Sequence, residues 1–248
     1  MAESVPLYNR RVVRPIECLE SGWALVKDRY WLFVGLILVG LLIGGLVPMG
    51  IIMGPMMCGI YLSLFHHMRG RKIEFGLLFK GFDYFVESLI ATLLQLVPVL
   101  IILIPFYVVF FAGLLTYSRG HQRGGGNPPE PAAIAALISG VCVFVLAIIV
   151  VGLIVGVLFI FSYPLIVDRK LRGVQAVKVS IKAAVANFWG LLGLLALNAL
   201  LSLVGALCCY VGAFLVLPLT FAALARAYEQ VFGLAPEQPS PPPVMAPA

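Results

Sequence analysis

The chain has 248 residues, of which 62% are hydrophobic and only 11% are charged. An average soluble domain has roughly 25% charged residues, so this chain has too few charges to cover the surface of a water-soluble fold of its size. Its mean hydropathy of +1.06 leads to the same conclusion. The composition excludes a soluble enzyme, a nucleic-acid-binding module and a disordered chain, and it indicates an integral membrane protein.

Long uncharged segments mark the predicted membrane spans, because a helix needs about 20 apolar residues to cross a bilayer. The segments that lack Asp, Glu, Lys and Arg are 30–68, 88–118, 131–167 and 183–225. The first and the last have room for two crossings, and each has a turn signal near its centre, at Pro48 and at Gly205 to Gly212. We therefore expect a helical hairpin in each.

The second and third uncharged segments are expected to form one long helix each. The second is too short for two crossings. The third is long enough to admit a hairpin, but its centre lacks a turn signal, so we favour a single tilted helix. We therefore expect an all-α integral membrane protein with six transmembrane helices. The expected spans are 31–47, 51–68, 88–117, 133–163, 188–206 and 211–228.

The positions of the basic residues predict the orientation of these spans. With six spans and the N-terminus inside, all but Arg119 and Arg123 of the 17 basic residues fall on the inner side. Translocated loops are poor in Lys and Arg, so we expect both termini to be cytoplasmic. The formal net charge of +6 then reflects topology and contact with anionic lipid headgroups rather than binding of nucleic acid.

The chain also contains a predicted internal repeat. Residues 15–47 align without a gap to residues 173–205, so that Tyr30-Trp31 matches Phe188-Trp189. Each unit consists of an amphipathic interfacial helix and a two-span hairpin, and the two spans between the units make the repeat parallel. The expected division is a polar segment 1–14, a membrane domain 15–233 with units 15–70 and 173–233 and linking spans 88–117 and 133–163, and a disordered Pro-rich tail 234–248.

Two more segments have a recognisable character. Residues 72–85 combine basic and aromatic side chains and are expected to form another interfacial helix. Residues 118–132 are rich in Gly and Pro and are expected to form a mobile loop on the outer side. Close helix contacts are expected at the small-residue pairs Gly40/Gly44, Gly50/Gly54 and Gly152/Gly156.

The predicted spans offer few groups that can do chemistry. Their centres lack acidic, basic and histidine side chains, which proton relays and ion-coupled carriers usually need. Gln95 and Asn198 are candidates for the polar lining of a substrate path, although hydrogen bonding between helices is the simpler interpretation. Five prolines are candidates for helix kinks that expose backbone carbonyls: Pro55, Pro98, Pro105, Pro164 and Pro218.

Basic residues at the inner ends of the spans form a predicted interfacial anchor, which consists of His66, His67, Arg69, Arg71, Lys72, Arg169, Lys170 and Arg172. Asp83, Glu87 and Asp168 are expected to pair with Lys80, Arg169 or Lys170 of the same surface. No carboxylate or thiol lies at helical spacing from the two histidines, so we expect no metal site. The sequence also lacks a catalytic set and a cofactor motif, and we expect neither enzymatic activity nor a cofactor.

Residues 163–195 resemble the membrane-domain family associated with bacterial glycerophosphoryl diester phosphodiesterases, and related prokaryotic multi-pass membrane families. The matching positions are Pro164, Asp168, Gly173, Ser180, Phe188 and Trp189. The resemblance implies a multi-pass protein of the bacterial inner membrane. It implies no catalytic residues here, because the phosphodiesterase chemistry of the fused members lies in a separate domain.

These features lead to two functional expectations. The first is a non-enzymatic membrane protein that acts as a scaffold or accessory subunit, or in membrane homeostasis. It would contact anionic lipids at the cytoplasmic face and associate with copies of itself or with other membrane proteins. The alternative is a transporter or channel-like protein for a lipid or another apolar small molecule, since such cargo needs no buried charge.

Overall fold

The computed structural model describes residues 7–46, 50–123, 131–208 and 211–236, and every regular element within these ranges is helical. The elements are α1 (Pro15–Val26), η1 (Lys27–Arg29), α2 (Tyr30–Leu46), α3 (Met53–Met68), α4 (Gly76–Phe79), η3 (Lys80–Tyr84), α5 (Phe85–Arg123), α6 (Pro131–Phe159), α7 (Ser162–Arg169), α8 (Gly173–Ala186), α9 (Phe188–Cys208) and α10 (Gly212–Phe232). The expectation of an all-helical chain is confirmed for the described residues.

Five helical stretches are long and apolar enough to cross a membrane: Pro15–Leu46, Gly76–Leu115, Ile138–Arg169, Phe188–Leu207 and Gly212–Phe232. Helix α3, with 16 residues, is shorter than a crossing requires. A chain with several candidate spans is therefore confirmed, whereas six crossings stay a prediction.

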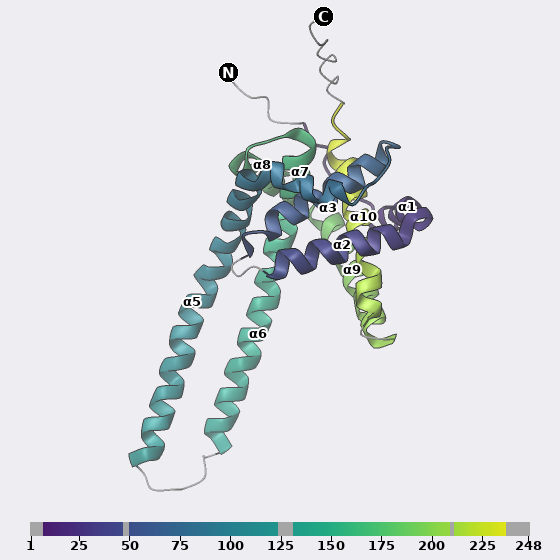
Figure 1. The fold of residues 1–248 in the computed structure, drawn as a ribbon. Helices are drawn as coiled ribbons and strands as arrows, with labels where there is room; N and C mark the ends of the chain where they lie inside the picture. Colours follow the sequence, from purple (N-terminus) through teal and green to yellow (C-terminus); the bar gives the residue numbers. More distant parts are fainter. Residues whose placement is uncertain (1–6, 47–49, 124–130, 209–210, 237–248) are drawn as a thin grey trace, which may run out of the picture.

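The helices fall into two parts (Figure 1). Helices α5 and α6 run side by side as a long hairpin, and α9 and α10 form a shorter hairpin that points to the same side. The remaining short helices gather at the opposite end of the molecule, where the chain begins and ends. We call this the terminal end. The backbone N–H of Asn9 donates to the Val231 carbonyl at 2.8 Å, so the two ends of the described chain are in direct contact.

The α5–α6 hairpin exposes apolar side chains over most of its described length. Ile101, Val109 and Val143 are each about two-thirds exposed. Phe106 stacks on Phe144 and ties the two helices together. A surface of this kind is stable only in an apolar solvent, which is what the composition of the chain requires.

Helices α2 and α3 form a hairpin whose turn lies close to the beginning of α5. A methyl group on Gly50 would lie 4.0 Å from the Thr92 side chain, and one on Gly54 would lie 2.9 Å from the Ser88 carbonyl oxygen. Helix α5 starts at Phe85, so Thr92 lies about 10 Å along its axis at 1.5 Å per residue. Gly50 and Gly54 therefore lie beside the first turns of α5.

Glycines allow the helices of the terminal end to approach each other at backbone distance. A methyl group on Gly22 of α1 would lie 2.8 Å from the Ala223 nitrogen of α10. One on Gly59 of α3 would collide with the Leu78 carbonyl, and one on Gly81 with the Pro55 carbonyl. Gly40 and Gly44 also lie in close contacts, as expected, whereas nothing within the described residues lies within 4 Å of a methyl group on Gly152 or Gly156.

The predicted spans coincide with helices α2, α3, α5, α6, α9 and α10, although their ends differ by several residues. The third uncharged segment contains one 29-residue helix, α6, rather than a hairpin. A short break at Ile160–Phe161 separates α6 from α7. Pro164 explains this break, because it lacks the N–H that would donate to the Ile160 carbonyl. The segment 72–85, expected to form one interfacial helix, contains the shorter elements α4 and η3 instead, and its position at an interface stays a prediction.

The two predicted repeat units pack differently. Helix α1 packs along α10 and α9, whereas α8 packs on α5, α6 and α7. The parallel repeat and its symmetry axis therefore stay a prediction from the sequence. The predicted tail 234–248 falls mostly outside the described residues, and so does the middle of the loop 118–132.

Candidate functional site

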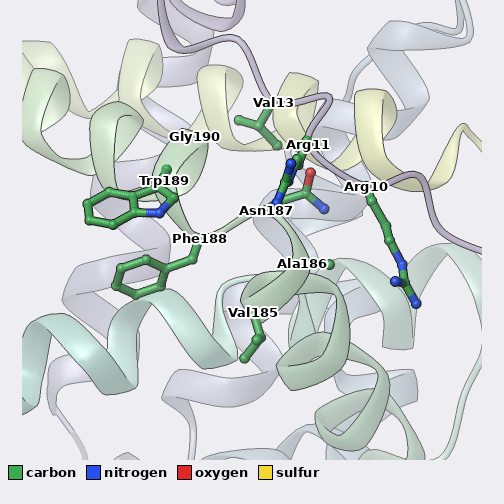
Figure 2. Close-up of a pocket in the computed structure, with 9 residues that line it drawn as sticks. All are labelled: Arg10, Arg11, Val13, Val185, Ala186, Asn187, Phe188, Trp189 and Gly190. Carbon is green, nitrogen blue, oxygen red and sulfur yellow. The ribbon is translucent and has the colours of Figure 1, made fainter.

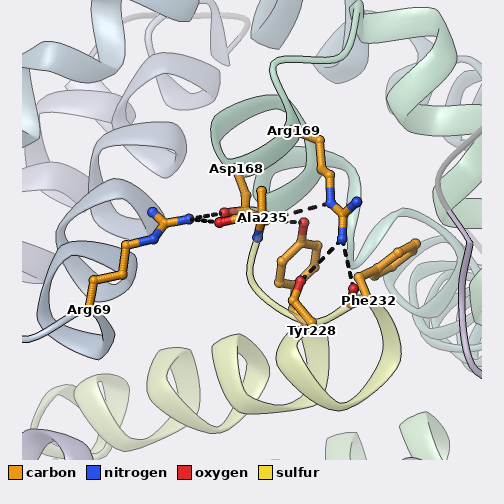
Figure 3. A network of polar contacts seen from close by, with 7 residues as sticks. Arg69, Asp168, Arg169, Tyr228, Phe232 and Ala235 are labelled. Carbon is orange, nitrogen blue, oxygen red and sulfur yellow. Dashed lines mark hydrogen bonds and ion pairs between the residues drawn. The ribbon is translucent and has the colours of Figure 1, made fainter. Parts of the chain in front are cut away.

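The polar centre of the terminal end is the carboxylate of Asp168, whose side chain is fully buried (Figure 3). Arg69, just past the end of α3, donates to one of its oxygens at 2.5 Å. The Tyr228 hydroxyl of α10 and the Ala235 N–H donate to the other at 2.8 and 3.0 Å. Asp168 therefore holds three separate segments of the chain together.

Arg169 reinforces this connection from the end of α7. It donates to the Phe232 carbonyl at 2.7 Å and to the Gly233 carbonyl at 3.4 Å, and its Nε lies 3.8 Å from Asp168. Carbonyl groups at a helix C-terminus lack partners within the helix, and a guanidinium is a suitable donor for them. Arg69 adds a bond to the Ala235 carbonyl at 3.2 Å. The C-terminal end of α10 is thereby fixed to α7 and α3.

A cavity of about 490 Å³ opens beside Asp168. Its basic lining residues come from the C-terminal ends of α3 and α7 and from the segments that follow them: His66, Arg69, Arg71, Arg169 and Lys170. Leu62, Val167 and Tyr84 also line the cavity. We call this the basic cavity. It is suited to binding an anion, because Asp168 is the only acidic residue in its lining.

A second cavity, of about 550 Å³, lies where the chain enters α9 (Figure 2). Arg10 and Arg11 lie on one side of it, and the rings of Phe188 and Trp189 on the other. The Asn187 side chain holds the N-terminal segment in place. It accepts from the Val12 N–H at 3.1 Å and donates to the Asn9 carbonyl at 2.9 Å.

The predicted interfacial anchor is only partly brought together. His66, Arg69, Arg71, Arg169 and Lys170 share the basic cavity. His67 points elsewhere, with its Nε2 at 2.9 Å from the Leu25 carbonyl. Lys72 and Arg172 are exposed and are not in the lining of this cavity.

The expected carboxylate partners are confirmed in part. Asp168 does approach Arg169, but its shorter contact is with Arg69. Glu87 accepts from the Gly173 N–H at 2.5 Å, at the start of α8. It thus stabilises a helix N-terminus rather than pairing with a lysine.

The candidate polar lining, Gln95 and Asn198, is not assembled into one path. Gln95 is half-buried on α5, and Asn198 is buried on α9; these two helices are not among the closely packed pairs of the described chain. Neither residue lines the cavities above. Both polar atoms of the Asn198 amide are buried without a hydrogen-bond partner among the described residues.

The candidate kink prolines occupy two kinds of position. Pro98 and Pro105 lie inside α5, and Pro218 lies inside α10. Pro55 and Pro164 lie in the first turns of α3 and α7, where a missing N–H costs nothing within the helix. The latter two therefore mark helix starts.

Sequence reasoning missed Tyr228, Asn187 and Gln230 as residues that organise the terminal end. Gln230 accepts from the Arg14 N–H at 3.1 Å. Their signal in the sequence is weak: each is a polar side chain near the end of an apolar helix. Asp168, in contrast, had a clear signal in the sequence, because it directly follows a long uncharged segment and lies in residues 163–195, which carry the family resemblance.

Within the described ranges, no group of three or more His, Cys, Asp or Glu side chains is placed to hold a metal ion. Comparisons of the chain with protein-family models, with curated proteins and with solved structures find no match.

Proposed function

We propose that this chain is a multi-pass protein of the bacterial inner membrane that acts as a scaffold or accessory subunit, or in membrane homeostasis, and has no active site of its own. The observation that carries the proposal is that buried and partly buried polar side chains of the terminal end bond to one another and to helix ends. Asp168, Arg69 and Arg169 fasten helix ends to one another. Such a centre gives a rigid base to the apolar α5–α6 hairpin.

The position of the charged groups supports an orientation with both termini in the cytoplasm. The ion pairs Arg14–Glu17, Arg69–Asp168 and Arg226–Glu229 belong to the terminal end. Cytoplasmic loops of membrane proteins carry an excess of Lys and Arg, and the inner leaflet carries anionic lipids. The basic residues of the terminal end therefore meet anionic headgroups at this face.

For the topology, we propose that α5, α6, α9 and α10 cross the membrane and that the α2–α3 hairpin enters it from the cytoplasmic side and returns. In support of this topology, Gly54 of α3 lies beside Ser88, about 5 Å along the axis of α5, and Gly50 lies beside Thr92, about 10 Å along it. A returning hairpin leaves both termini on the same side, as six crossings would. A cysteine at position 51 distinguishes the two: an impermeant maleimide added from the outer side labels it only if α2 and α3 cross completely.

The alternative function, a transporter or channel-like protein for an apolar cargo, has one specific observation in its favour. The buried amide of Asn198 lacks a partner among the described residues, and such a group is costly to keep in an apolar span unless it is used. Asn198 on α9 and Gln95 on α5 lie on helices that are not a closely packed pair of the described chain, which argues against a shared path.

The two functions are separated by reconstitution of the full chain into liposomes that contain a fluorescent phospholipid. Dithionite bleaches only the label in the outer leaflet, so the residual signal reports exchange between leaflets. The scaffold proposal predicts the same slow exchange as in protein-free liposomes. Exchange that is accelerated by the wild type and abolished in Asn198→Leu would contradict it and support the transporter.

A further inference from the structure

We propose that the cavity at the start of α9, lined by Arg10 and Arg11, is a specific binding site for the phosphate group of an anionic phospholipid. We call it the α9 cavity (Figure 2). This inference rests on the proposed function, because it requires the terminal end to lie at the headgroups of the inner leaflet. It goes further in that it names one cavity, one chemical group and the residues that bind it.

The N-terminal segment is fixed over the α9 cavity by hydrogen bonds of its backbone. The carbonyl of Asn9 and the N–H of Val12, on either side of the two arginines, both bond to the Asn187 side chain, at 2.9 and 3.1 Å. Between these fixed points Arg11 has a left-handed backbone conformation with φ of 56°, which is rare for a residue with a side chain. The Arg10 and Arg11 side chains are therefore held at the cavity while only the backbone is used to fix the segment.

The α9 cavity carries positive charge without a counter-charge. The described lining contains no acidic residue, in contrast to the basic cavity, and Arg10 and Arg11 are both exposed. Within the described ranges the Arg11 guanidinium has neither an ion pair nor a hydrogen bond. The Arg10 guanidinium lies 6.0 Å from the centre of the Tyr8 ring, a neutral partner that leaves its charge in place. The ion pairs of the adjoining helices α1 and α10 use other arginines, Arg14 and Arg226.

The donors at the α9 cavity suit a phosphate group. A guanidinium presents parallel N–H groups that can bind two phosphate oxygens at once, and two adjacent arginines offer this arrangement twice. The first turn of α9, at Phe188 to Gly190, also lines the cavity, so the positive end of the α9 dipole adds to the potential of the arginines. The volume of about 550 Å³ lies in the range of sites that hold small organic ligands.

The apolar surface beside the α9 cavity favours a lipid over a soluble phosphate compound. Trp189 is 81% exposed and Val185 is 61% exposed, and both line the cavity. Tryptophan is enriched at the level of the lipid headgroups. Leu200, Leu203 and Leu207 are exposed as well, and their helical spacing puts them on the same face of α9 as Trp189. A phosphate held at the arginines thus has an apolar stripe next to it along which acyl chains can lie.

The test is native mass spectrometry of the full chain in neutral detergent with dioleoyl phosphatidylglycerol or dioleoyl phosphatidylcholine, whose quaternary ammonium balances its phosphate charge. The wild type is expected to retain one phosphatidylglycerol with about tenfold preference, since a hydrogen bond to a charged group contributes roughly that factor. The double variant Arg10→Gln/Arg11→Gln should lose this preference. The matched control is Lys178→Gln/Lys182→Gln, which removes the same charge from exposed positions of the neighbouring helix α8 and should bind within about twofold of wild type.

The outcomes separate this inference from the proposed function. Equal loss in both double variants would overturn the specific site and leave a diffuse electrostatic contact. An unchanged preference in Arg10→Gln/Arg11→Gln would also overturn the site. Equal binding of both lipids by the wild type would contradict the proposed anionic contact as well. Displacement of phosphatidylglycerol by millimolar inorganic phosphate would show that the cavity takes free phosphate and would overturn the lipid assignment.

A measurement on the wild type guards against a variant that fails to fold. A phosphatidylglycerol analogue with a photoactivatable headgroup should cross-link to peptides that contain residues 9–12 or 185–190. Cross-links to residues 66–71 or 168–172, at the basic cavity, with the same yield would overturn the assignment to the α9 cavity.

Discussion

Replacement of Asp168 by asparagine tests whether the Asp168 contacts hold the terminal end together. Asparagine has the same shape but offers only one acceptor oxygen, and its NH₂ group cannot accept. Whichever way the amide turns, either the Arg69 guanidinium or the Tyr228 hydroxyl and the Ala235 N–H lose their acceptor. The variant also removes the negative charge opposite Arg69, which is 23% exposed at its side chain.

The expected loss of stability follows from these contacts. A hydrogen bond to a charged group contributes about 1.5–3 kcal/mol, and breaking a buried ion pair costs about 3–5 kcal/mol. Water reaches Arg69 and reduces the second figure, so we expect a loss of about 3 kcal/mol. In a chain of this length, 1 kcal/mol corresponds to about 2–4 °C, so the melting temperature should fall by about 6–12 °C.

The assay is thermal unfolding of the full chain in detergent, followed by circular dichroism. The control is Asp83→Asn, the same chemical change at an exposed carboxylate of η3, which should shift the melting temperature by less than about 2 °C. The double variant Arg69→Gln/Asp168→Asn should lose less than the sum of the two single variants. Equal melting temperatures for Asp168→Asn and Asp83→Asn would refute the structural role of Asp168.

Three further variants test the packing. Gly59→Ala should destabilise the chain by about 2 kcal/mol, because the added methyl group collides with a backbone carbonyl of α4. The control Gly156→Ala should not destabilise it, because its methyl group meets open space among the described residues. Equal shifts of the melting temperature in the two variants would contradict the close packing at Gly59. Asn198→Leu should raise the free energy of unfolding by about 1–2 kcal/mol, because it removes a buried amide without a partner, and a decrease would show that this amide is bonded. Asn187→Ala should speed hydrogen exchange of the Val12 amide about tenfold, since this amide loses its acceptor. An unchanged exchange rate would contradict the hydrogen bond between Val12 and Asn187.

The helices were predictable because their signal is local. A long uncharged segment bounded by charges defines an apolar helix, and the turn signals near Pro48 and Gly205 locate the hairpins. The same reasoning predicted α6 as one helix and named Pro164 as a candidate kink, but the expected span ran on to residue 163, past the break at Ile160–Phe161. The hydropathy of a segment indicates only whether it is long enough to cross, however, so it did not reveal that Gly50 lies beside Thr92 of α5.

The contacts of the terminal end were less predictable because they join segments that are far apart in the chain. Arg69 and Asp168 were both predicted to lie at the inner face, but nothing in their spacing indicated that they pair. Tyr228 donates to Asp168 from a helix that begins far downstream, and the packing of α10 on α3 and of α3 on α7 brings the two together. The basic cavity is a consequence of this packing rather than of any sequence motif.

The central claim is that the chain spans a membrane with both ends on the cytoplasmic side and the α5–α6 turn on the other. It is tested by single cysteines at positions 10 and 118 of a variant whose natural cysteines are replaced, in sealed membrane vesicles of known orientation. We predict that an impermeant maleimide labels position 118 only in right-side-out vesicles and position 10 only in inside-out vesicles. Labelling of both positions from the same side would contradict the account.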